Sequence, residues 1–560
     1  MTVMVGRKAI MEIFRTEGVE CIFGNPGTTE LGFIDMLQDY PFLRYIVCLQ
    51  ESIALSAAQM YANASGKTGV VNLHVAPGLG NALGSMYNAL VGKMPLVVTA
   101  GQQDSRMVVR EPILSYDLVA MAKPLTKWAV QLQHIEEIPV IFPRAFKVAQ
   151  DAPRGPVFIA LPNNVIEQAT DLHLPEPSAY HRRTRPDAAG LAAAADLLAH
   201  ARHPVLICGD GVAASQAQAE LVELAEHIGA QVWGTVIIGA LGFPNMHPQY
   251  RGELAAEYPL IRRALGEADV VLAVGADLFD EVWYTDEPSP LPEGCKLIHV
   301  DTSSWTIGKN LTPTIGLLAD PKLALQELSE MVVPAMTDSA RQQAQQRRAA
   351  MAEHKRKDRE RQEQRARDHW ERSPIAPARL MAVLRDCLPP QAVIFNEAIT
   401  ATADLQRTIS LQQGSLFGNH GGGIGQGLPG ALGVQLAFPD RPVVALVGDG
   451  SAMYTVQSFW TAARHQIPVV YVILNNRSYR ILKLNMNRYR RNVNIPSGRP
   501  YPFMDFADPS LDFVEIAHGM GVAGSRVDHP EAIQPAITQA LASGKPYVLE
   551  VVTEGSVPAQ

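Results

Sequence analysis

Runs of apolar residues alternate with amphipathic stretches along the whole chain, and this alternation predicts strands separated by helices. In the first part of the chain the apolar runs lie at residues 19–24, 44–49, 69–74, 95–100 and 156–161. Strands that alternate with helices form a parallel sheet that is covered by helices on both faces. We therefore expect one α/β domain over residues 1–166.

The same alternation returns in two further blocks. Apolar runs at residues 204–208, 230–236, 270–274 and 296–300 lie within a block that we expect at residues 187–335. A third block covers residues 375–560, and residues 339–372 between them are dense in Arg, Gln, Lys and Glu with interspersed Ala, which favours a solvated linker helix. The predicted fold class is α/β, with three doubly wound parallel-sheet domains.

Composition and charge narrow the class of protein. The 560 residues are 47% apolar and 19% charged, which is typical of a globular protein with ample core, and the net charge of −8 includes no basic block of the kind that binds nucleic acid. No apolar run is long enough to span a membrane, and residues 1–24 have the pattern of an amphipathic helix rather than a signal peptide. The five cysteines lack metal-binding spacing, so we expect free thiols and a cytoplasmic protein.

A carboxylate and an amide follow two neighbouring predicted strands in the third block. Gly448-Asp449-Gly450 ends the apolar run 443–447, and Asn475-Asn476 ends the run 469–474. The carboxyl ends of parallel strands meet at one edge of a sheet, where such folds bind ligands. Carboxylate and amide oxygens suit a small hard cation, and glycines allow a close approach of phosphates. Asp449 and Asn476 therefore predict a Mg²⁺–diphosphate site.

The second block contains a similar triplet without the second half of the motif. Gly209-Asp210-Gly211 also follows a strand-like run, but the equivalent downstream stretch, residues 233–239, has no asparagine pair. We interpret this copy as an ordinary strand-to-helix turn. The block also lacks GxGxxG and a phosphate-binding lysine motif, so the sequence leaves open whether it binds a nucleotide.

These motifs resemble the thiamine diphosphate-dependent decarboxylase and carboligase family. Two of the segments that carry the resemblance are the motifs of the third block, Gly448-Asp449-Gly450 and Asn475-Asn476. The others are residues 23–30, Leu49-Gln50-Glu51, Asn72-Leu73-His74, residues 99–103 and Asn396-Glu397. They extend over essentially the whole chain and are most similar to the benzoylformate decarboxylase branch. The resemblance implies an N-terminal pyrimidine-binding, a central and a C-terminal diphosphate-binding domain, with thiamine diphosphate and Mg²⁺ as cofactors.

The resemblance also implies roles for single residues. Glu51 hydrogen-bonds the aminopyrimidine ring and so favours the tautomer whose own amine removes the C2 proton, and Ile424 is the aliphatic side chain on which the cofactor bends. The other cofactor-binding positions are Asn396, Thr400, Gly423, Gly450, Ser451 and Tyr479, and Ser478 joins Asp449 and Asn476 as a metal ligand.

Two further residues match positions near the substrate. His74 matches a histidine that relays protons at the reacting carbon, and Thr28 falls where the family has a serine near the substrate carboxylate. Taken alone, His74 also fits a core histidine and Thr28 a helix N-cap. The family's second active-site histidine has no counterpart in residues 280–286, where Val282 and Trp283 stand instead, and His420 is either a substitute for it or a surface or core residue.

The expected reaction is the non-oxidative decarboxylation of a 2-oxo acid to an aldehyde. The alternative is an acetolactate synthase-like carboligase, or a lyase of a 2-hydroxy ketone or 2-hydroxyacyl-CoA, that acts through the same enamine; a non-catalytic homologue is a third possibility. Ile481, Asn485 and the polar stretch 487–499 predict a narrower or more polar substrate pocket. The resemblance implies a homotetramer whose active sites lie at the dimer interface. The substrate side chain and the pathway cannot be inferred from the sequence.

Overall fold

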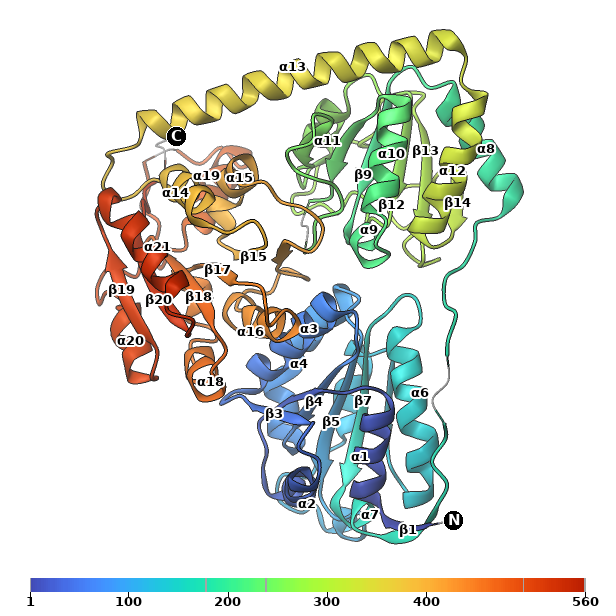
Figure 1. The fold of residues 1–560 in the computed structure, drawn as a ribbon, viewed down its shortest axis with the longest axis vertical. Coiled ribbons are helices and arrows are strands. Elements are labelled where there is room, and N and C mark those ends of the chain that lie inside the picture. The colour runs from blue at the N-terminus through green and yellow to red at the C-terminus, as the bar shows by residue number, and fades with distance from the viewer. Residues whose placement is uncertain (1, 177–178, 237–238, 497, 558–560) are drawn as a thin grey trace.

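The computed structural model describes residues 2–176, 179–236, 239–496 and 498–557, and it contains three six-stranded parallel sheets (Figure 1). The first sheet has the order β3-β2-β4-β5-β7-β6. Its strands are β2 Cys21–Gly24, β3 Arg44–Val47, β4 Gly69–Leu73, β5 Leu96–Gln102, β6 Trp128–Gln131 and β7 Pro156–Pro162. Helices α1 Gly6–Thr16, α3 Glu51–Ser65, α4 Val75–Val91 and α6 Ile138–Gln150 pack against it. Glu51 and His74 therefore stand at the carboxyl edge of this sheet.

The central sheet has the order β11-β10-β9-β12-β13-β14. Its strands are β9 Pro204–Cys208, β10 Gln231–Gly234, β11 Tyr250–Glu253, β12 Val270–Val274, β13 Lys296–Asp301 and β14 Ile315–Leu318. Helices α8 Ala188–Ala199, α10 Gln218–Ile228 and α12 Pro321–Ala335 bury apolar faces against one another and the sheet. The two edge strands β11 and β14 were not among the predicted strands, because each is short and only partly apolar.

The third sheet has the order β16-β15-β17-β18-β20-β19. Its strands are β15 Val393–Glu397, β16 Leu416–Gly418, β17 Val443–Gly448, β18 Val469–Asn475, β19 Ala523–Val527 and β20 Tyr547–Val552. Strand β17 pairs with β18 in parallel, with Gly448 opposite Leu474, so the residues that follow the two strands emerge side by side. The predicted α/β class with three doubly wound parallel sheets is confirmed.

A 31-residue helix, α13 Asp338–Asp368, runs from the central sheet to the third one (Figure 1). The Thr337 hydroxyl caps it by accepting a hydrogen bond from the backbone N–H of Ala340, and most of its side chains are exposed. It has a narrow buried contact through Ala344 and Met351. Within the described residues every helix is either too short or too polar to pass through a bilayer.

The first and third sheets share one apolar core. Helix α3 packs against α16 Gly427–Ala437, and a single cluster of buried side chains contains Phe23 of β2 and Phe395 of β15. A Cβ atom on Gly433 would lie 2.0 Å from the carbonyl oxygen of Ala57, so only glycine allows the two helices to approach this closely.

Candidate active site

A cavity of about 290 Å³ opens at the carboxyl edge of β15, β17 and β18. Eight of the residues that the sequence predicted line it: Thr400, Ile424, Asp449, Gly450, Ser451, Asn476, Ser478 and Tyr479. They come from four separate stretches of the chain, and the parallel arrangement of the strands brings them together. The predicted diphosphate and metal ligands therefore share one cavity.

Asp449 carries a buried oxygen that has no protein partner. Its side chain is 2% exposed, and one carboxylate oxygen, Oδ1, accepts a hydrogen bond of 2.9 Å from the backbone N–H of Gly450. The other oxygen, Oδ2, has no hydrogen-bond donor among the described residues, and burial raises the pKa of the carboxyl to about 6. A buried, unsatisfied carboxylate oxygen is costly unless a cation or a donor binds it. This geometry fits a divalent cation.

The neighbouring ligand candidates present oxygen rather than nitrogen or sulfur. The side-chain oxygen of Asn476 accepts hydrogen bonds from the Ser478 backbone N–H at 3.0 Å and from its hydroxyl at 3.1 Å. Among the described residues no group of three or more His, Cys, Asp or Glu could hold a metal, so a cation here depends on amide, hydroxyl and backbone oxygens beside one carboxylate. Such a set suits Mg²⁺, which keeps positions for phosphate oxygens and water.

A glycine-rich turn places Ile424 in the cavity wall. The buried carboxylate of Glu397 accepts hydrogen bonds from the backbone N–H groups of Gly425, Gln426 and Gly427 at 3.0, 3.0 and 2.7 Å. The side chain of Asn419 adds a fourth, and burial nevertheless raises the pKa of Glu397. Four donors on one carboxylate fix the turn in a single conformation, so Ile424 is held rigidly.

Asn396 and Gly423 lie outside this wall. The amide of Asn396 donates to the Thr402 hydroxyl at 2.9 Å, and its oxygen accepts from the backbone N–H of Ala398. The carbonyl oxygen of Gly423 accepts from Asn419 and Gln426. These hydrogen bonds secure the loops that carry Thr400 and Ile424, and neither residue is among those that line the cavity.

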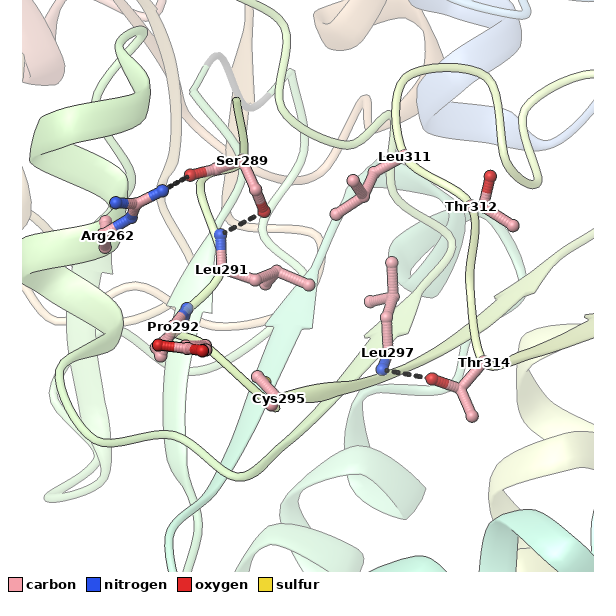
Figure 2. Close-up of a pocket in the computed structure, with 11 residues that line it drawn as sticks. Arg262, Ser289, Leu291, Pro292, Cys295, Leu297, Leu311, Thr312 and Thr314 are labelled. Atoms are coloured by element: carbon pink, nitrogen blue, oxygen red, sulfur yellow. Dashed lines mark hydrogen bonds between the residues drawn. The ribbon is translucent and has the colours of Figure 1, made fainter. Parts of the chain in front are cut away.

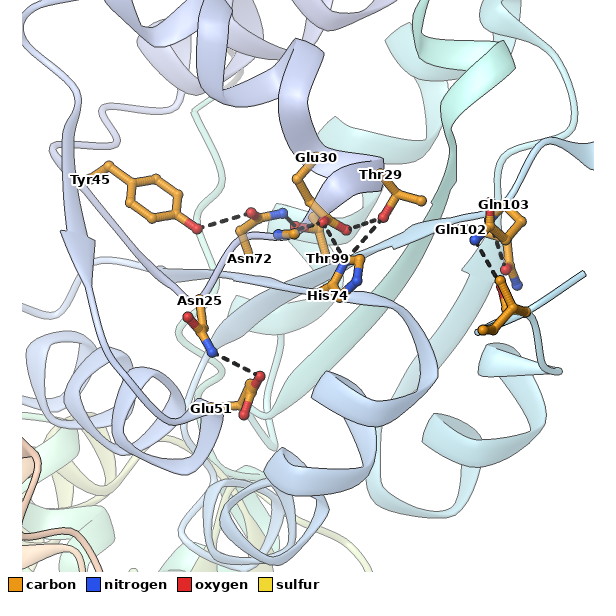
Figure 3. A network of polar contacts seen from close by, with 12 residues as sticks. Asn25, Thr29, Glu30, Tyr45, Glu51, Asn72, His74, Thr99, Gln102 and Gln103 are labelled. Carbon is orange, nitrogen blue, oxygen red and sulfur yellow. Dashed lines mark hydrogen bonds and ion pairs between the residues drawn. The ribbon is translucent and has the colours of Figure 1, made fainter.

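Glu51 stands in the first turn of α3, well inside the first sheet's carboxyl edge (Figure 3). Its side chain is 6% exposed and accepts hydrogen bonds from the amides of Asn25 at 3.1 Å and Asn81 at 2.9 Å. A Cβ on Gly78 would approach it to 3.3 Å, so the carboxylate is confined on that side as well. Two amide donors orient the group without neutralising it with a cation.

His74 is held by a buried carboxylate that the sequence analysis did not single out. Its Nδ1 lies 2.8 Å from Oε2 of Glu30 and 3.3 Å from the hydroxyl of Thr29, as Figure 3 shows. Glu30 also accepts hydrogen bonds from the Thr29 hydroxyl and the Gly27 backbone N–H. With Nδ1 occupied, the other ring nitrogen, Nε2, is the atom that can exchange a proton. Thr28 is exposed and Thr29, beside it, makes the contact with His74.

Residues with strained backbones follow two of these side chains. Val75 and Arg477 have φ angles of 41° and 54°, in the left-handed region that non-glycine residues rarely adopt. Val75 directly follows His74, and Arg477 directly follows Asn476. Strain of this kind persists where the surrounding structure holds it, and it occurs often at functional sites.

Three family models match consecutive parts of the chain. The N-terminal TPP binding domain of thiamine pyrophosphate enzymes matches residues 4–121, their central domain residues 191–328, and their C-terminal TPP binding domain residues 400–551. The chain belongs to the thiamine diphosphate-dependent enzymes. Membership in this family accounts for the two motifs at the carboxyl edges of the first and third sheets.

Relatives of this thiamine diphosphate-dependent enzyme include decarboxylases and carboligases. Benzoylformate decarboxylase of Pseudomonas aeruginosa is 34% identical, over 98% of this chain and 99% of its own length. A probable acetolactate synthase large subunit of Methanocaldococcus jannaschii is 28% identical, over 98% and 92%. The solved structure of the thiamine diphosphate-dependent 4-hydroxybenzoylformate decarboxylase of Rhodococcus jostii RHA1 superimposes with a TM-score of 0.85 at 31% identity, over 98% and 99%.

His420 has a structural position in this member of the family. It is 4% exposed, with Nδ1 3.2 Å from a carboxylate oxygen of Asp210 and Nε2 3.3 Å from the amide of Asn63. These contacts join the central block to both outer blocks. Gly209-Asp210-Gly211 forms a turn into α9 Asp210–Ala214, as expected. The carboxylate of Asp210 also accepts hydrogen bonds from the backbone N–H groups of Gly239 and Ala240. His420 does not line the Asp449 cavity.

Val282 and Trp283 stand where the family has its second active-site histidine, and Trp283 lies beside α19 Arg480–Asn492. The Arg488 guanidinium stands 5.5 Å above the ring of Trp283 and forms an ion pair with Glu257, whereas Val282 is 68% exposed. Neither Val282 nor Trp283 can carry a proton. Figure 2 shows a separate cavity in the central block, around Arg262 and Cys295, which contains none of the predicted site residues.

The Asp449 cavity does not include the residues predicted on the first sheet. All residues that line the Asp449 cavity lie between Pro377 and Glu554, and Thr28, Glu51 and His74 are not among them. The site residues predicted on the first sheet and those predicted on the third sheet therefore do not line one common cavity within a single chain.

Proposed function

We propose that this enzyme decarboxylates a 2-oxo acid to an aldehyde, with thiamine diphosphate and Mg²⁺ as cofactors. The observation that carries the proposal is the contact of His74 with the buried Glu30 at the edge that holds Glu51, since a fixed imidazole can deliver the proton that an aldehyde product requires. The similarity to two decarboxylases of aromatic 2-oxo acids supports the same reaction. It also favours an aromatic side chain on the substrate.

The assembly that we propose is a homotetramer in which dimers form the active sites. Asp449 and its neighbours lie in a cavity without Glu51 or His74, so a second copy of the chain would supply the missing half. Closed symmetry allows each copy to give its first sheet to one site and its third sheet to the other.

The chain's own residues divide the work between the two halves. When bound, thiamine diphosphate supplies a carbon nucleophile and accepts the electron pair of the bond that breaks. Asp449, Asn476 and Ser478 would hold the divalent ion, and Ile424 would shape the space above it. Glu51 would hold a proton at a carboxyl oxygen, and His74 would donate one from Nε2. The overall change consumes one proton and converts the 2-oxo acid into CO₂ and an aldehyde.

The direct test uses purified protein with thiamine diphosphate and MgCl₂. A panel of aryl and branched-alkyl 2-oxo acids is added, and CO₂ and aldehyde are measured together. We expect at least one acid to give both products in equal amounts. The absence of CO₂ from every acid on the panel rejects the proposal.

A second candidate is carboligation, or cleavage of a 2-hydroxy ketone or 2-hydroxyacyl thioester. It is favoured by Val282 and Trp283, which leave one proton donor fewer than the decarboxylase pattern has, and by the acetolactate synthase relatives. A slow final protonation gives a second carbonyl compound time to react at carbon. Product analysis with a 2-oxo acid and excess aldehyde separates the two: a 2-hydroxy ketone as the main product identifies a carboligase.

A further inference from the structure

A second, larger cavity adjoins the Asp449 site and shares one wall residue, Ile399, with it. Its volume is about 790 Å³, within the range of small-molecule binding pockets, and its walls come from β10, β11, α13 and α15 Thr402–Thr408. It therefore lies at the junction of the central block, the long helix and the third block (Figure 1). It does not include the carboxyl ends of β9, β12 and β13, where sheets of this type usually bind ligands.

The walls carry an excess of positive charge. Five cationic side chains line the cavity, against the two carboxylates Glu253 and Asp358: Arg251, Lys355, Arg356, Arg359 and Arg407. The ammonium group of Lys355 donates to the backbone oxygens of Asn245 at 2.7 Å and Tyr250 at 3.2 Å. Arg356 and Arg359 pair with glutamates of α13 itself.

Two of these cations have no counter-charge in contact. Within the described part of the chain, the side chains of Arg251 and Arg407 form no hydrogen bond and no ion pair, although Asp358 attracts Arg251 and Asp404 attracts Arg407 from farther away. Asp358 instead pairs with His354 and Arg361. Burial and then the charge of Arg251 lower the pKa of Lys355 to about 8, so the cluster repels its own members. An anion bound among them would relieve this repulsion.

One of the two carboxylates in the walls is already engaged. The carboxylate of Glu253 accepts a hydrogen bond from the amide of Gln406, and burial raises the pKa of Glu253 to about 7. The indole N–H of Trp233 and the hydroxyl of Tyr250 are fully buried and are not exposed to the cavity. The walls therefore offer more cationic donors than carboxylate acceptors, and an occupant with acceptor oxygens suits them.

The remaining walls are apolar. Met246, Pro248, Leu254 and Ile399 line the cavity together with the Trp233 ring, so there is room for an organic body beside the charged groups. Phosphate oxygens are acceptors that match several cations at once. A simple inorganic anion would leave most of the volume and the apolar walls unused.

We propose that this cavity binds an organic phosphate, a phosphate or diphosphate ester with an aromatic body. Arg251, Lys355 and Arg407 contact the phosphate oxygens, and the apolar walls hold the ring. The site is independent of the proposed decarboxylase activity.

The test is calorimetric titration of the full chain loaded with thiamine diphosphate and MgCl₂, so that the Asp449 cavity is filled. The probes are ADP, phenyl phosphate and inorganic pyrophosphate. We expect an ester to bind once per chain, and to bind tighter than pyrophosphate. ADP binding alone indicates a nucleotide, and equal binding of phenyl phosphate indicates a general aryl phosphate site. Arg251→Met and Lys355→Met should each weaken binding about tenfold or more.

Matched controls lie on α13 and in the central block. Lys357→Met removes an exposed lysine two residues along α13, and Arg263→Met removes an exposed arginine of the central block; both should bind like the parent. Arg251 makes no contact whose loss would unfold the protein, so Arg251→Met decides the outcome if Lys355→Met is unstable. Quenching of tryptophan fluorescence by the ester, lost in Trp233→Phe, locates the ligand.

Three results overturn the proposal. One is that neither ester binds at about millimolar concentration, the weak end of specific affinities. Another is that Arg251→Met binds like the parent. The third is that excess thiamine diphosphate displaces the ester competitively, because this places it in the Asp449 cavity.

Discussion

Nδ1 of His74 lies 2.8 Å from a carboxylate oxygen of Glu30, whose side chain is 2% exposed. Glu30 is therefore a positioning residue, since it fixes which imidazole nitrogen is free. We expect Glu30→Gln to lower kcat about tenfold to hundredfold with little change in KM, as loss of an orienting carboxylate does elsewhere. Steady-state kinetics on the best 2-oxo acid measure this, with Asp39→Asn, an exposed carboxylate nearby, as the control. An unchanged kcat contradicts the role.

The proposed division of the site between two copies of the chain predicts complementation. Glu51→Gln and Asp449→Asn should each abolish most activity. A mixed oligomer contains some sites built from an intact Glu51 of one copy and an intact Asp449 of the other, so the mixture should regain about a quarter of the parental activity. Co-expression with two different tags and purification of the mixed species provide the measurement. If the mixed oligomer stays inactive, each site is built within one chain.

The turn that Glu397 holds around Ile424 predicts that a substitution of Ile424 changes the reaction rate rather than cofactor binding. Ile424→Ala removes the branched side chain on which the cofactor is expected to bend but leaves Asp449 and Asn476 in place. The cofactor affinity should therefore change little. A small misplacement of reacting groups lowers rates by up to about a hundredfold, and we expect a loss of that order in kcat. Ile399→Ala trims another wall of the same cavity and should have a smaller effect on kcat. Equal losses would show that Ile424 contributes only bulk.

A histidine at the contact between the outer blocks predicts a pH dependence of stability. Nε2 of His465 accepts a hydrogen bond of 2.9 Å from the Val47 backbone N–H, and burial, followed by the charge of Arg464, lowers the pKa of His465 to about 4. The unfolded chain takes up this proton below its ordinary value of about 6.5, while the fold does not. Stability from this group is thus complete above pH 6.5 and lost as the pH falls toward 4.

Urea unfolding between pH 4 and 7 measures this dependence. The partly exposed ring is screened by solvent, so we expect a contribution on the order of 1 kcal/mol. His465→Gln retains an acceptor but not the titration, and should flatten this part of the profile. His529→Gln, an exposed histidine of the same block, should leave the profile unchanged. A parallel profile for His465→Gln contradicts the assignment.

The sequence predicted the sheets and the Asp449 cavity because both follow from regular patterns. Alternating strands and helices determine which chain segments meet, and the end of a strand identifies Asp449 and Asn476 without side-chain detail. The edge strands β11 and β14 were missed because each is only four residues long.

The sequence pattern could not decide which of two neighbouring residues makes a contact in the site. Thr29 and Glu30 contact His74 and Glu397 lines the cavity, whereas the sequence analysis named Thr28 and Asn396, whose roles stay predictions. Successive residues of a strand point to opposite faces, and a short turn directs each side chain differently. Their direction depends on the backbone that the whole fold sets. The glutamate in the recognised segment 23–30 was the available signal, since a carboxylate is rarely buried without a partner.

The close fit of Gly433 against Ala57 has a consequence for how the molecule comes apart. One interior is common to the outer sheets, whereas the central sheet has clusters of its own. Heat or denaturant can therefore melt the middle of the chain separately, but amide protons deep in α3 and α16 should exchange with solvent together. Glu51 and Asp449, which we propose to activate the cofactor and to hold its metal ion, would lose their positions in the same event.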